Sequence, residues 1–234
     1  MKRIFTITLS IGIFLFATTY NSGKAASPLE GHVIVVDAGH GGTDSGSTAC
    51  EGYPEKTANL DIANRLRTLL ENDYAQVVMT REDDSTLSNE DRYTKANTAG
   101  GEALVSVHLN GSTNANVNGT LGLYGKKNKD LKFTEVMHAD MPAELGVTDL
   151  GVTNFASGVL LKSNMPATIS ETVFISNTDE CVALRDGDGT RQQEIAQSLY
   201  NGFLKWFSQN PDSGGDDEGS EPTCPANSNS PKCR

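Results

Sequence analysis

The sequence lacks an excess of basic side chains. Its 234 residues carry 19 Lys and Arg against 30 Asp and Glu, which gives a net charge of −11 at pH 7. Binding of nucleic acid or anionic lipid through a basic surface is therefore excluded. The chain also lacks an internal repeat, and no run beyond residue 19 is apolar enough to span a membrane. A hydrophobic content of 37% fits one globular domain with polar extensions.

The amino terminus has a composition of its own. Lys2 and Arg3 precede an apolar stretch over residues 4–19, and the small residues Ala25 and Ala26 follow. This layout is typical of a secretory signal peptide, so we expect residues 1–26 to be a signal peptide. An uncleaved membrane anchor is the alternative, although the stretch is short for a span. The expected location is the periplasm, or the secreted fraction and the cell wall.

Cysteine is scarce. The chain has Cys50, Cys181, Cys224 and Cys233, and none of them has the CxxC spacing of a structural zinc knuckle. An even number in an exported chain indicates disulfides, and four cysteines allow three pairings. Cys224 and Cys233 are close together in one polar segment, so a local loop is the simplest choice. That choice leaves Cys50 to pair with Cys181.

Two regions follow the expected signal peptide. Residues 208–234 are rich in Gly, Ser, Pro, Asn and acid, which predicts a flexible tail. Residues 27–207 alternate strand-like with helix-like segments, which predicts an α/β sheet covered on both faces. The expected strands are residues 33–37, 76–81, 103–111, 120–125, 158–162 and 167–177. The expected helices are residues 55–72, 88–97, 133–145 and 195–207.

Two of only four histidines follow or end buried strands. His40 comes after the run "VIVV", and His108 ends the run "ALVSVH". Glu55 opens the helix that follows the first histidine loop. Because ligands in open α/β folds lie at the carboxyl ends of strands, these side chains predict a centre of two imidazoles and one carboxylate, the ligand set of a catalytic zinc. Taken singly, each has an ordinary explanation: a structural histidine, or a glutamate that favours the helix dipole.

Glu171 interrupts an otherwise apolar strand, "ATISETVFIS". One interpretation is a carboxylate on the solvated face of a half-buried strand. The other is a general base, whose carboxylate must lie beside the water that a metal activates. The sequence pattern by itself allows both.

Five segments occur in an order that resembles a known family. They are "VVDAGHGGTDSG", "EKTANLDIANRL", "TREDDSTLSNEDRYTKAN", "ALVSVHLNG" and "MPATISETVFISN". Together they resemble the zinc-dependent N-acetylmuramoyl-L-alanine amidases of the family Amidase_3, over residues 32–207. The resemblance implies a single catalytic domain over residues 27–207, with a six-stranded, mostly parallel sheet flanked by helices on both faces.

The resemblance also implies roles for particular residues. Zinc would be held by His40, Glu55 and His108, and Glu171 would be the general base. The reaction would be hydrolysis, by zinc-activated water, of the amide between N-acetylmuramic acid and L-alanine of the peptidoglycan stem peptide. Thr172 and Val173 stand where a leucine–glycine pair is more usual in the family. We expect a monomer, and the sequence identifies no activator protein.

Alternatives and minor candidates stay open at this point. The rival functions are a zinc peptidase or deacetylase acting on another substrate, and a non-catalytic wall-binding module. We expect His32 and His138 to be ordinary surface residues. Arg81 and Arg92 would contact substrate or form surface ion pairs.

Overall fold

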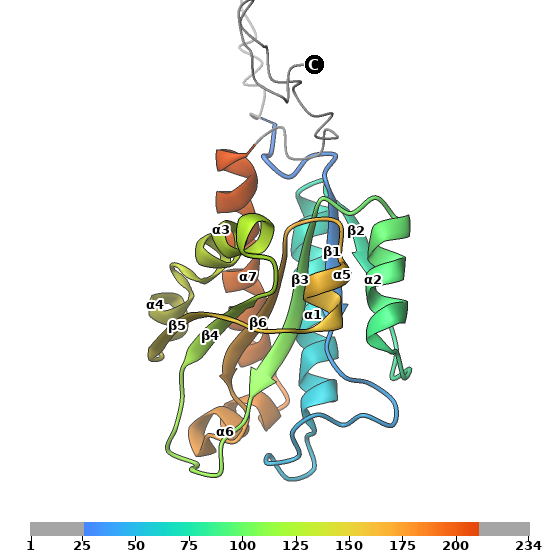
Figure 1. Ribbon diagram of the computed structural model, residues 1–234. Coiled ribbons are helices and arrows are strands. Elements are labelled where there is room, and N and C mark those ends of the chain that lie inside the picture. Colours follow the sequence, from blue (N-terminus) through green and yellow to red (C-terminus); the bar gives the residue numbers. More distant parts are fainter. Residues whose placement is uncertain (1–25, 211–234) are drawn as a thin grey trace, which may run out of the picture.

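The computed structural model describes residues 26–210 and shows a single mixed sheet of six strands (Figure 1). The strand order is β2-β1-β3-β6-β4-β5. The pairs β1–β2, β1–β3 and β3–β6 are parallel, whereas β4 runs antiparallel to β6 and parallel to β5. The strands are β1 (Val33–Ala38), β2 (Gln76–Met79), β3 (Ala103–Asn110), β4 (Thr120–Tyr124), β5 (Asp149–Asn154) and β6 (Ala167–Phe174). The predicted six-stranded, mostly parallel sheet is confirmed.

Helices cover both faces of the sheet, as predicted. One layer packs around α7, and the other consists of two helices that contact each other on the opposite face of the sheet. The first layer contains α1 (Glu55–Asn72), α3 (Lys127–His138), α4 (Met141–Leu145) and α7 (Thr190–Gln209). The second contains α2 (Asn89–Thr98) and α5 (Gly158–Lys162). A further helix, α6 (Thr178–Arg185), follows β6 and contacts α7.

The alternation of side chains along the strands explains the two layers. Successive strand residues point to opposite faces, so Val36 and Val105 pack with α1 and α7, whereas Val35 and Leu104 pack with α2 and α5. All four side chains are fully buried. Both faces of β1 and β3 are therefore core, and their ionisable residues, Asp37 and His108, lie near the carboxyl ends.

Helix signals in the sequence were mostly reliable. Ser88 caps α2 through the predicted capping box with Asp91. Ile195, Leu199 and Phe203 lie on the buried face of α7, as their helical spacing predicts.

Two element predictions were wrong, and two elements were missed. Residues 158–162 form helix α5 instead of a strand, because a five-residue apolar run carries too little periodicity to separate the two. The helix predicted over residues 133–145 is two helices, since Pro142 at the start of α4 cannot continue α3. Strand β5 and helix α6 were not predicted at all.

One disulfide joins distant parts of the fold. Cys50 and Cys181 are bonded, across 131 residues of sequence, as predicted. The bridge ties the turn before α1 to α6. The predicted Cys224–Cys233 pair, residues 1–25 of the predicted signal peptide and residues 211–234 of the predicted tail lie outside the described residues. The tail prediction over residues 208–234 began too early, because residues 208 and 209 belong to α7. Among the helices of residues 26–210, none combines the length and the apolar character that a membrane crossing requires.

Candidate metal centre

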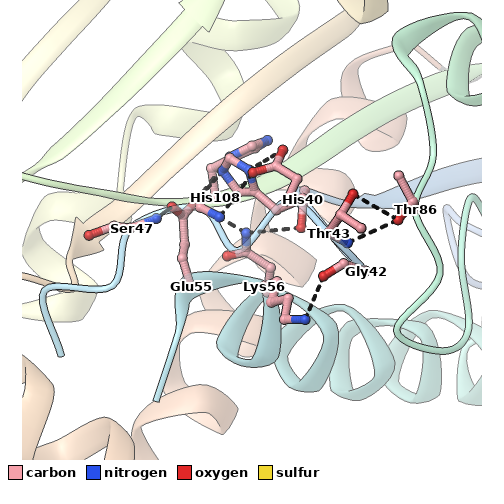
Figure 2. A network of polar contacts seen from close by, with 12 residues as sticks. His40, Gly42, Thr43, Ser47, Glu55, Lys56, Thr86 and His108 are labelled. Carbon is pink, nitrogen blue, oxygen red and sulfur yellow. Dashed lines mark hydrogen bonds and ion pairs between the residues drawn. The ribbon is translucent and has the colours of Figure 1, made fainter. Parts of the chain in front are cut away.

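Three predicted ligand side chains meet at the carboxyl edge of the sheet (Figure 2). β1 and β3 are parallel neighbours, with Ala38 opposite Val107, so their carboxyl ends lie side by side. His40 follows β1 by two residues, His108 lies near the end of β3, and Glu55 is the first residue of α1. One ligand atom from each side chain lies within 4.8 Å of the other two.

The donor atoms converge on a single carboxylate oxygen. Glu55 Oε1 lies 3.2 Å from His40 Nε2 and 3.1 Å from His108 Nδ1. The two imidazole rings are arranged edge to face, with centroids 4.7 Å apart. Glu55 is 4% exposed, and both histidines are partly open to the surface. Two imidazole nitrogens and a carboxylate at this spacing fit a transition metal such as zinc, whereas calcium and magnesium prefer oxygen ligands.

Neighbouring groups hold two of the candidate ligands, His40 and Glu55, in orientation. Asp44 Oδ2 lies 2.8 Å from His40 Nδ1, which leaves Nε2 directed at the centre. The backbone N–H groups of Ser47 and Leu109 donate to the two oxygens of Glu55 at 2.8 and 3.1 Å. Such outer contacts fix the tautomer and direction of metal ligands in proteins.

The backbone around His40 explains the glycines of "DAGHGG". A Cβ atom at Gly39 would lie 2.3 Å from His108 Nε2, so no side chain fits there. His40 itself has φ of +59°, in the left-handed region that non-glycine residues seldom adopt. This conformation costs about 1–3 kcal/mol, and surrounding contacts must offset it.

His40 and Glu55 stabilise each other's charged forms. Burial lowers the pKa of His40, but hydrogen bonds and the charges of Glu55 and Asp44 outweigh it and raise the pKa to about 9. Burial raises the pKa of Glu55, but the hydrogen bonds and charges of His108 and His40 hold it well below its usual range. A metal ion bound here would displace protons from the imidazoles.

Glu171 lies beside the three candidate ligands. It pairs with His108 across the β3–β6 ladder, so both side chains project from the same face of the sheet. It lines a cavity of about 300 Å³ together with His40 and His108. Burial raises the pKa of the Glu171 carboxyl, an effect that the positive charge of His108 opposes. The side chain is half-buried in this cavity and does not lie on an open strand face.

The rest of the cavity includes Arg92 and several residues that the sequence did not single out. Its apolar wall includes Leu123, Val159 and Phe155, and the Phe155 ring is 48% exposed at the β5–α5 connection. No pattern marks Phe155, because it stands in a connection between elements. A larger groove of about 630 Å³ lies between α1 and α7, and the four predicted site residues do not line it.

Several expectations about surface residues were wrong. Arg81 and Arg92 are 2% and 5% exposed, and both contact the backbone around His40. His138 is 6% exposed and lies 2.7 Å from Asp149, so it is a buried residue of α3. His32 is mostly covered and lies against Glu102. A single sequence does not show whether a polar side chain is buried, because its partners are far away along the chain.

An α/β sheet that brings two histidines and two carboxylates together at the carboxyl ends of its strands is typical of metal-dependent hydrolases. The family model described as N-acetylmuramoyl-L-alanine amidase, Amidase_3, matches residues 34–205. The chain belongs to this family.

Individual relatives agree with this assignment. The chain is 30% identical to N-acetylmuramoyl-L-alanine amidase LytC of Bacillus subtilis over 81% of its own length, but it spans only 38% of LytC. It is 32% identical to the catalytic domain of the amidase CwlV from Bacillus (Paenibacillus) polymyxa var. colistinus, with a TM-score of 0.71 over 76% of this chain and 98% of that one. The CwlD amidase of Clostridioides difficile, solved in complex with the GerS lipoprotein, is 28% identical, with a TM-score of 0.65 over 76% and 99%.

Proposed function

We propose that the chain is an N-acetylmuramoyl-L-alanine amidase. It hydrolyses the amide bond between the lactyl group of N-acetylmuramic acid and L-alanine of the peptidoglycan stem peptide. The observation that carries the proposal is the convergence of His40, Glu55 and His108, two of which line one cavity together with Glu171. Family membership supports the choice of bond, because the residues alone indicate only metal-assisted amide hydrolysis.

Zinc is the proposed cofactor, held by His40 Nε2, Glu55 Oε1 and His108 Nδ1. The three protein donors leave a coordination position for water or substrate. When bound, zinc lowers the pKa of water to about 7 and polarises the scissile carbonyl.

Glu171 is the proposed general base. Its carboxylate lines the cavity from the strand next to His108, which supports a role in taking a proton from the attacking water. The same carboxyl then donates a proton to the leaving amine of L-alanine. A pKa raised by burial suits the first step, because it makes the carboxylate a stronger base than an exposed glutamate, and the protonated carboxyl then holds the proton for the leaving amine.

The proposed partner is peptidoglycan, and the proposed location is outside the cytoplasmic membrane. This location is supported by the expected division of the chain into a signal peptide, residues 1–26, and a catalytic domain, residues 27–207. It is also supported by relatives that are named as cell-wall amidases. We also expect a monomer. The lipoprotein in the CwlD complex makes a partner protein worth testing.

Mass spectrometry of muropeptides after digestion of purified sacculi tests the reaction. The expected products are free stem peptides that begin with L-alanine and glycan strands that keep their lactyl groups. Cleavage within the stem peptide would indicate a peptidase, and loss of acetyl groups would indicate a deacetylase. Elemental analysis should find about one zinc per chain. The metal mechanism would be ruled out if elemental analysis found no transition metal in the protein and its activity were undiminished in excess chelator.

A further inference from the structure

Two buried arginines contact the loop between β1 and α1, residues 39–54, which carries His40 and is called the histidine loop below. Arg81 follows β2, and Arg92 lies in the first half of α2, so both come from the segment next to β1 in space. We propose that Arg81 and Arg92 are positioning residues that fix the backbone carrying the ligands His40 and Glu55. The inference rests on the proposed metal site, because it assigns these two residues to the geometry of that site.

Arg92 holds the unusual backbone conformation of His40. Its guanidinium donates to the carbonyl oxygens of Ala38 and His40, each at 2.8 Å. The same group forms a buried ion pair with Asp37 Oδ1 at 2.7 Å. The three acceptors are on the short stretch that ends with the strained φ of +59° at His40. Arg92 therefore contributes contacts that offset the strain where the first ligand leaves the strand.

Arg81 joins the two backbone segments that carry ligands. It donates to the carbonyl oxygens of Ala38 and Gly39, each at 2.8 Å, just before His40. It also donates at 2.9 Å to the carbonyl oxygen of Lys56, the residue after Glu55. One rigid guanidinium thus sets the distance between the histidine loop and the first turn of α1, and with it the distance between two ligands.

The outer part of the loop is held by α1 and by the segment that follows β2 (Figure 2). Lys56 Nζ donates to the carbonyl oxygen of Gly42 at 2.8 Å and to Asp84 at 2.7 Å. Thr86 Oγ1 accepts from the backbone N–H of Thr43 at 3.0 Å. These contacts are more exposed to solvent than those of the arginines, so we expect them to constrain the loop less strongly.

The cost of this arrangement argues against a role in general stability. A buried ion pair is often no more stable than well-packed apolar side chains of the same volume. Burial and the neighbouring charge of Arg92 lower the pKa of Arg81, which shows that the surroundings disfavour a second cation. Arginine is nonetheless suited to the task, because its planar group presents five donors in a fixed arrangement, whereas lysine has a single ammonium.

Contact with substrate is the competing role. Arg92 borders the cavity, but it is 5% exposed, and its NH1 and NH2 groups already donate to Asp37, Ala38 and His40. Little donor capacity faces the cavity. A positioning role predicts an effect on metal binding even when no substrate is present, and a substrate contact does not.

The test compares Arg92→Lys and Arg81→Lys with a matched control, Arg67→Lys. Arg67 lies on α1, is 37% exposed and pairs with Glu71 and Glu82 at the surface. Zinc affinity is measured by competition with a chelator, and the visible spectrum of the cobalt-substituted protein reports ligand geometry. Melting temperatures are measured with and without zinc, so that the shift caused by zinc is separated from a loss of fold stability.

We expect each buried variant to bind zinc about 10–100-fold more weakly, the usual effect of changing a residue that supports a ligand. The cobalt spectrum should change, the melting shift caused by zinc should shrink, and Arg67→Lys should match the wild type in all three measurements. Wild-type affinity and spectrum in both buried variants would overturn the inference, even if their melting temperatures fell. Failure of both to fold would also overturn it, by assigning the arginines to the fold itself.

The outcome for the proposed function is separate. If the wild-type protein binds no zinc, the proposed metal site fails. If the wild type binds zinc and the variants bind it equally well, the inference about the arginines fails alone.

Discussion

Strand β1 has a histidine near each end, and both histidines face a carboxylate. At the amino end, His32 Nδ1 lies 2.5 Å from Glu102 Oε2. At the carboxyl end, His40 Nδ1 lies 2.8 Å from Asp44 Oδ2. A histidine–carboxylate contact is therefore present in both regions, and it does not by itself mark a metal ligand.

The two ends differ in what surrounds the second ring nitrogen. The ring of His32 packs against Phe207, with centroids 4.2 Å apart, and Glu102 is also occupied by the backbone N–H of Val33. The second nitrogen of His40 points at Glu55, which His108 approaches from the other side. Convergence of a second imidazole on a shared carboxylate distinguishes the candidate centre from a structural contact. Five predictions test this difference.

His40→Ala should have the largest effect. It removes one of three protein donors, so we expect zinc content to fall from about one per chain to background and hydrolysis of sacculi to fall with it. Elemental analysis and product release measure the two effects. If the variant still bound zinc and remained active, His40 would not be a zinc ligand, and the two ends of β1 would not differ in this respect.

Glu171→Gln should separate the base from the ligands. Glutamine keeps nearly the same shape but cannot accept a proton. We expect turnover to fall by about 10²–10⁴-fold while zinc content stays near that of the wild type. Activity close to wild type in the zinc-loaded variant would remove Glu171 from the mechanism and leave the family assignment intact.

Replacing Cys50 and Cys181 together by serine should destabilise the protein. The bridge closes a loop of 131 residues, so chain entropy predicts a loss of about 4–5 kcal/mol at most in the free energy of unfolding. Because Cys50 precedes α1 by few residues, we also expect weaker zinc binding. Denaturant unfolding gives the first quantity. An unchanged midpoint would show that the bridge constrains little.

Asp37→Asn, near the carboxyl end of β1, should change how the free energy of unfolding depends on pH in acid. Burial raises the pKa of Asp37, but Arg92, Ser106 and Thr80 together hold it below the ordinary value of 3.8. A lowered pKa stabilises the fold above pH 3.8, and that contribution is lost as pH falls below this value. The variant should lose roughly 3 kcal/mol at pH 7, because Arg92 keeps its charge without a partner. Its stability should then depend less on pH below about 4 than that of the wild type, which parallel denaturant titrations would reveal.

His32→Ala should have the smallest effect and serves as the matched control for His40→Ala. It removes one contact to a charged group and part of the packing on Phe207, so we expect a loss of about 1–3 kcal/mol in stability. Zinc content and turnover at a temperature well below unfolding should not change. A loss of zinc in this variant would erase the contrast between the two ends of β1.

Local patterns predicted the elements that are long or strongly periodic. The helical spacing of apolar residues predicted α1 and α7, and runs of β-branched residues predicted β1, β3 and β6. β5 was missed because it is an edge strand that pairs with β4 and buries little of its length. α5 was mistaken for a strand because five residues complete barely more than one helical turn.

The sequence by itself determined which side chains are candidates for the site. His40, Glu55, His108 and Glu171 each stand at a strand end, at a helix start or within an apolar strand, and such positions can be recognised from neighbouring residues alone. The fold class followed from the same local signals, because alternation of strands and helices restricts a chain of this length to few architectures.

Only the tertiary structure decided how those candidates meet. It determined that Nε2 of His40 and Nδ1 of His108 face Glu55. It also placed Arg81 on Ala38 across 43 residues and Arg92 on His40 across 52 residues of sequence. Nothing local encodes such contacts, because the carbonyl oxygens that accept them belong to the backbone, which is the same for every residue type. The orientation of the ligands therefore depends on how β1, β2 and the first turn of α2 pack together.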